Sequence, residues 1–149
     1  MTTYERLIAE LGDGLGTALA PDGSGLTEVF AENRAVLLRA DETGESELTV
    51  FATVATASGD GFSPDTLKRA LAMNLFGREV TGHHLGLFAD TLILSASIPI
   101  PDLSTEALAE RIIMLARLAN TLADTLAIPA PAAPEGGETS RLGGDFLAV

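Results

Sequence analysis

Two short stretches of the chain contain residue types that could perform chemistry. Gly12-Asp-Gly-Leu-Gly16 has the glycine spacing of loops whose backbone N–H groups hold phosphate oxygens. Such a loop follows a strand and opens a helix, whereas the apolar spacing before Gly12 is that of a helix. The glycines are therefore predicted to end a helix rather than to bind a nucleotide.

The second stretch is the pair His83-His84, the chain's two histidines. Neighbouring side chains on an extended segment point to opposite sides, so the pair cannot easily share one metal ion. The chain has no cysteine, which excludes disulfides, thiolate metal sites and cysteine nucleophiles. Its serines form no Gly-x-Ser-x-Gly nucleophile elbow. We predict no catalytic residue, no metal and no cofactor.

The charge balance excludes further classes of function. Acidic residues outnumber basic ones by 21 to 9, for a net charge of −12. Such a chain repels nucleic-acid phosphates and anionic membranes, so neither is an expected partner. Apolar residues make up 46% of the chain, enough for a core. No basic and apolar leader opens the sequence, and we expect a cytoplasmic protein without membrane insertion.

Three helices are predicted from apolar spacing and caps. The first has a stripe of Tyr4, Leu7, Ile8, Leu11 and Leu15, with Thr2 and Glu5 as a capping box. The second begins at the cap Ser63 and stops at Gly77. The third is capped by Ser104 and runs to about Ile128, with an apolar stripe formed by Leu108, Ile112, Leu115, Ala119 and Leu122.

Between the helices the apolar period changes to two, which predicts strands. Their expected ranges are Leu26–Asn33, Ala35–Ala40, Glu47–Ala57, Leu85–Ala89 and Thr91–Ile98, with a turn at Asn33-Arg34. The short connections indicate an antiparallel meander of three strands, then a helix, two strands and a helix: an α+β fold. Residues 1–128 form the predicted domain. Residues 129–149, rich in Pro, Ala and Gly, form a flexible C-terminal tail.

This order, together with several stretches, resembles the class I type III secretion chaperones, the CesT- and SycE-like family. The stretches are Leu7–Gly16, Leu67–Gly77, Leu85–Leu87 with Leu92–Leu94, and Pro99–Leu103 followed by Ala107-Leu108. The resemblance implies a homodimer without enzyme activity that binds the N-terminal segment of a secreted effector in extended form. It would keep that segment soluble and export-competent in the bacterial cytoplasm.

The resemblance also implies two sets of site residues. The dimer interface would contain Leu67, Leu71, Met73, Asn74, Leu75, Leu85 and Leu87. The effector-binding surface would contain Tyr4, Leu7, Ile8, Leu11, Val29 and Phe30. The stripe of the first helix fits core packing as well as a binding groove, and the spacing does not decide between them.

Two other functions remain open at this point. One is a dimeric α+β adaptor or regulatory module that binds a protein without any role in export. The other is a small-molecule-binding protein or enzyme, which would need a deep pocket with convergent polar groups.

Overall fold

The computed structural model describes residues 1–76, 83–126 and 141–142, with residues 75, 76, 141 and 142 described by backbone alone. The fold is α+β, and the predicted order of helices and strands is confirmed. The elements are α1 (Thr3–Leu15), β1 (Leu26–Ala31), β2 (Arg34–Ala40), β3 (Glu47–Thr56), α2 (Pro64–Phe76), β4 (His84–Phe88), β5 (Thr91–Pro99), α3 (Thr105–Thr125) and β6 (Arg141–Leu142).

The strands form one sheet in the order β4-β5-β3-β2-β1-β6. Neighbours pair antiparallel, except that β6 runs parallel to β1. The β1–β2 hairpin turns at Glu32 and Asn33, whose φ values are 53° and 63°. Two left-handed residues suit the twist of a two-residue hairpin. The predicted turn at Asn33-Arg34 was wrong by one residue, because Arg34 pairs with Ala31 and begins β2.

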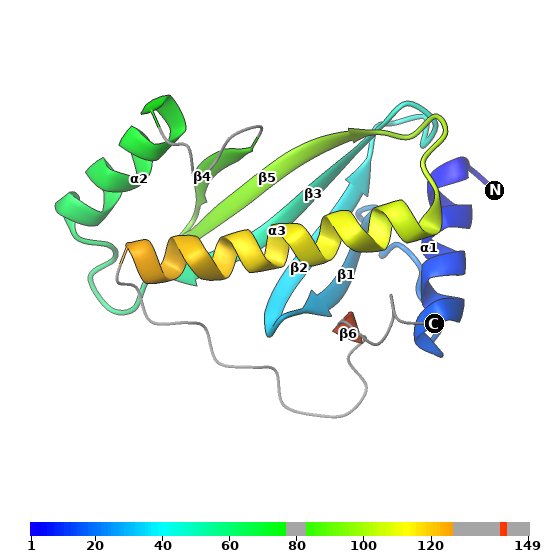
Figure 1. Ribbon diagram of the computed structural model, residues 1–149, viewed down its shortest axis with the longest axis horizontal. Coiled ribbons are helices and arrows are strands. Elements are labelled where there is room, and N and C mark those ends of the chain that lie inside the picture. The colour runs from blue at the N-terminus through cyan, green and yellow to red at the C-terminus, as the bar shows by residue number, and fades with distance from the viewer. Residues whose placement is uncertain (77–82, 127–140, 143–149) are drawn as a thin grey trace.

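Helix α3 packs against β1, β2, β3 and β5 and forms the core with one face of the sheet. Figure 1 shows it running across the sheet, with α1 at one end of the molecule and α2 at the other. Ser104 caps α3 by accepting a hydrogen bond from the Ala107 N–H at 3.1 Å. Its predicted apolar stripe is confirmed as buried: Leu108, Ile112, Leu115, Ala119 and Leu122.

Helix α1 begins with the predicted capping box, in which Thr2 and Glu5 each bond the other's backbone N–H. It ends at Gly16, which has φ 72°. At Gly12 an added Cβ would lie 2.6 Å from the carbonyl oxygen of Thr17, so the returning chain requires glycine there. The glycines of this stretch therefore shape a helix end, as the sequence predicted.

Arg34 is buried within the core side of the sheet, with 2% of its surface exposed. Its Nη1 donates to the carbonyl oxygens of Thr53 and Val54, where the β3–β5 register shifts between Thr53 and Ala55. Its Nε donates to Oδ1 of Asn120 at 2.5 Å. Burial lowers the pKa of the guanidinium, and the charge of Asp124 opposes that shift. The buried cation thus satisfies the carbonyl of Val54, which the register shift leaves without a partner in the ladder.

Most of the predicted C-terminal tail lies outside the described residues, including Phe146–Val149. Its described pair, β6, was not predicted as a strand. Arg141 aligns with Phe30, and Leu142 with Ala31.

Candidate protein-binding surfaces

An apolar groove lies between α2 and β4. Its volume is about 180 Å³, and we call it the α2–β4 groove. The lining residues are Leu67, Ala70, Leu71, Asn74, Leu85, Gly86, Leu87 and Leu92. Leu71 and Leu87 are 68% and 54% exposed. Phe88, which follows Leu87 and alternates to the other face of β4, is 73% exposed. Large apolar side chains clustered at the surface of a folded protein mark a site of association.

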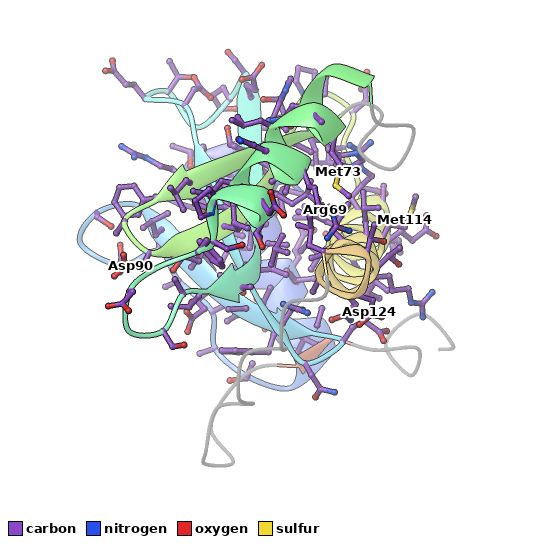
Figure 2. The ribbon with its side chains drawn as sticks, turned by 90° about the vertical axis from the view of Figure 1, so that its left-hand side faces the viewer. Arg69, Met73, Asp90, Met114 and Asp124 are labelled. Atoms are coloured by element: carbon purple, nitrogen blue, oxygen red, sulfur yellow. The ribbon has the colours of Figure 1, made fainter. Side chains whose placement is uncertain are left out.

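The position of α2 depends on two polar contacts. The side-chain amide of Asn74 donates to the Leu85 carbonyl oxygen and accepts from the Leu85 N–H, both at 2.7 Å. Arg69 donates to the Thr125 carbonyl oxygen at the end of α3, at 2.5 Å. Figure 2 shows Arg69 and Met73 on the side of α2 nearer α3, where Met114 also lies. These contacts fix α2, and with it the exposed apolar side of the groove, relative to the sheet.

A second apolar surface is the face of the sheet opposite α3. Strand alternation places Phe30, Leu37, Phe51 and Ile93 on this outer sheet face, and each is half-buried. Leu37 lies directly opposite Phe51 in the β2–β3 register. Within the described part of the chain, the helices that contact the β1–β2–β3–β5 strands do so from the core side. The outer sheet face therefore presents apolar side chains that no described helix covers.

The predicted effector-binding residues lie mainly in the core. Tyr4, Leu7, Ile8, Leu11 and Val29 are each at most 5% exposed. The hydroxyl of Tyr4 donates to the Leu38 carbonyl oxygen at 3.0 Å and lies 2.8 Å from Oγ1 of Thr27. Burial raises the pKa of this hydroxyl.

The direct contact predicted for these five residues therefore needs correction, because the spacing that groups them on one face also packs that face against the sheet. Phe30, on the opposite side of β1, is the residue of that set that keeps an accessible side chain.

The predicted dimer residues gather at the α2–β4 groove. Leu71, Asn74 and Leu87 are exposed, Leu67 and Met73 are half-buried, and Leu85 is 7% exposed. Leu75 belongs to α2, but its side chain lies outside the described part of the structure.

Sequence reasoning missed Phe88, Leu37, Phe51 and Ile93. A sequence signal existed for Leu37, Phe51 and Ile93. Their strands, β2, β3 and β5, carry large apolar residues at positions facing both sides of the sheet, which indicates apolar side chains on both faces.

The histidine pair brings no metal site into view. His84 begins β4 and is exposed, and His83 directly precedes it. Among the described residues no three His, Cys, Asp or Glu side chains cluster closely enough to hold an ion.

No described helix has the length and apolar character needed to span a membrane.

Comparisons with known proteins agree with this architecture. Residues 6–123 match the model of the Tir chaperone protein (CesT) family. No curated protein sequence matches the chain significantly.

Solved structures with a similar fold include the ExsC–ExsE complex, with a TM-score of 0.69, 19% identity, and coverage of 85% of this chain and 97% of the other. The Yersinia pestis type III secretion chaperone SycH, solved with a fragment of YscM2, has a TM-score of 0.57 and 24% identity. That match covers 80% of this chain and 98% of the other. The HopA1–SchA chaperone–effector complex has a TM-score of 0.54 and 22% identity, and that match covers 84% of this chain and 91% of the other. At these identities the likeness concerns the fold.

Proposed function

The chain belongs to the Tir chaperone protein (CesT) family, and from that premise we propose that it is a type III secretion chaperone. In this proposal it binds the N-terminal segment of a secreted effector in extended form and keeps it soluble and export-competent. The observation that carries the proposal is the family match over residues 6–123, which spans α1 through nearly all of α3.

The α2–β4 groove is the proposed homodimer interface. A two-fold interface places the same patch of both copies in contact, so one exposed apolar cluster on each protomer is sufficient. Leu71 and Leu87 supply that cluster, and their exposure costs apolar hydration free energy that pairing would recover.

The outer sheet face and the β1 edge are the proposed contacts of the effector segment. An extended segment presents side chains alternately, so one set can rest on apolar neighbours while its backbone bonds a strand edge. Phe30 and Leu37 lie on the outer face nearest that edge, and Phe51 continues the apolar surface inward.

Charge and burial together explain how holding a segment would keep it soluble. Each apolar Å² buried contributes about 25 cal/mol, offset by the ordering of a previously disordered segment. The net charge of −12 keeps complexes apart in solution. This activity needs no bond-making chemistry. We therefore infer a non-enzymatic protein that acts in the bacterial cytoplasm before export.

The test is co-expression with secreted proteins encoded beside this chain, followed by mass measurement of the purified complex. The expected species contains two copies of the chain and one effector N-terminal segment. Phe51→Ala should weaken that complex by about tenfold, as loss of a central apolar contact does. Met114→Ala, which removes an exposed apolar side chain from α3 on the other side of the sheet, is the control and should leave affinity unchanged. Recovery of a signalling protein instead of a secreted one would identify an adaptor and refute the export role.

A further inference from the structure

The two outer strands of the antiparallel sheet differ in what occupies their free edges. At β4, both backbone groups of Leu85 bond the side-chain amide of Asn74, each at 2.7 Å. The side-chain amide offers an NH2 donor and a carbonyl acceptor side by side, as the peptide groups of a neighbouring strand would. Asn74 therefore closes the β4 edge at Leu85, and the incoming helix α2 crowds that side of the sheet.

The β1 edge is occupied by the chain itself. Strand β6 aligns there in parallel, Arg141 with Phe30 and Leu142 with Ala31, and it also lies against α3. Figure 1 shows β6 beside β1, separated along the chain from α3 by the segment 127–140. Among the described residues, Leu26–Val29 have no strand partner on this side.

This occupant is easily displaced on energetic grounds. A two-residue parallel pairing supplies few ladder hydrogen bonds, and parallel pairing is slightly weaker per residue than antiparallel pairing. Each such bond contributes only about 1 kcal/mol net. The tether between α3 and β6 raises the local concentration of the segment to about the millimolar range, so the pair forms despite weak contacts.

We propose that the segment containing Arg141 and Leu142 is an internal competitor for the β1 edge, displaced when a longer extended polypeptide adds along β1. This inference rests on the proposed function, since it specifies how access to the effector surface is regulated. The displacing partner is an extended peptide that can pair with all of β1, from Leu26 to Ala31, and place apolar side chains beside Phe30 on the outer sheet face. Because this peptide pairs with more of β1 than β6 does, it can make the backbone hydrogen bonds to Leu26–Val29 that β6 does not make.

The test uses the full chain and two proline variants. Leu142→Pro removes a backbone N–H inside the pair, whereas Thr139→Pro places proline in the same tail outside it. The probe is a fluorescent synthetic peptide with the sequence of residues 138–149. The L142P chain should bind it about tenfold more tightly than the natural chain, the factor expected if the edge is open in about one molecule in ten. T139P should behave as the natural chain.

Amide hydrogen exchange supplies an independent readout. Whichever of the Phe30 and Ala31 amides faces β6 should exchange faster in L142P and remain protected in T139P. Equal peptide affinity and equal exchange in the natural and L142P chains would overturn the inference. The inference would also be overturned if a 138–149 peptide carrying Leu142→Pro bound the L142P chain as tightly as the natural-sequence peptide does.

These outcomes are separate from the fate of the proposed function. If effector segments bind the natural chain and L142P equally, the chaperone function stands and internal competition is refuted. If no secreted segment binds either chain while the peptide result holds, the edge contact stands and the export role fails.

Discussion

Arg34 at the start of β2 and Asn120 in α3, 86 residues apart, share a hydrogen bond of 2.5 Å from Nε to Oδ1. The amide of Asn120 in turn donates to the Glu32 carbonyl oxygen at 3.1 Å, at the turn that precedes Arg34. The two residues therefore join the β1–β2 hairpin to the helix that covers it. The hairpin also carries the β1 edge, so this contact positions the proposed binding surface.

Replacing the buried Arg34 with an apolar residue should lower the free energy of unfolding. Arg34→Met leaves the Val54 carbonyl and Oδ1 of Asn120 without their donor in the core, and we expect a loss of about 2–4 kcal/mol in unfolding free energy. Urea unfolding measures it. Arg39→Met, at an exposed position of the same strand, is the matched control and should change stability by less than about 0.5 kcal/mol. Equal effects of both variants would refute the role assigned to Arg34.

The Asn74–Leu85 pair predicts a local effect on the β4 edge. Asn74→Ala removes both side-chain hydrogen bonds, and the Leu85 amide should exchange with solvent about tenfold faster. Asn74→Asp keeps an acceptor for the Leu85 N–H but loses the donor to its carbonyl oxygen, so that amide should stay more protected than in N74A. Hydrogen exchange resolved at Leu85 distinguishes the three chains. Unchanged protection in N74A would show that α2 is held by other contacts.

The proposed dimer interface predicts an effect on association. Leu71→Asp places a charge in an apolar contact, and the dimer dissociation constant should rise about a hundredfold, equivalent to about 2.7 kcal/mol. Met114→Asp on α3 adds the same charge to another exposed apolar position, 62% exposed, and should remain dimeric. Sedimentation equilibrium measures both. A dimer that survives L71D unchanged would place the interface elsewhere.

The β2–β3 loop predicts a dependence on pH. Hydrogen bonds from Thr43 and from the backbone N–H groups of Glu47, Ser46 and Thr43 lower the pKa of Asp41 well below its ordinary value. The unfolded chain therefore binds this proton at higher pH than the folded one. The stabilisation is complete above the unfolded pKa and is lost as the pH falls toward the folded pKa.

Asp41→Asn should accordingly reduce the drop in urea midpoint between pH 6 and pH 3. Glu42→Gln, at the exposed neighbouring position, serves as the control for removing one charge from this loop. An undiminished drop in D41N would show that other carboxylates dominate the acid sensitivity.

The order of elements and most of their bounds followed from the sequence, because periodicity and caps are local. Thr2 with Glu5, Ser104, and the stripe of α3 were placed correctly for that reason. The resemblance to the secretion chaperones was likewise confirmed by the family match.

The sequence by itself determined which side chains share a face of each helix or strand. Only the tertiary structure decided which of those faces is covered, and it buried Val29 while leaving Phe30 accessible. It also decided that Arg34 lies inside and that Asn74 closes an edge, since each choice depends on partners distant in the chain. Spacing fixes relative orientation along one element, whereas burial is settled by the elements that pack against it.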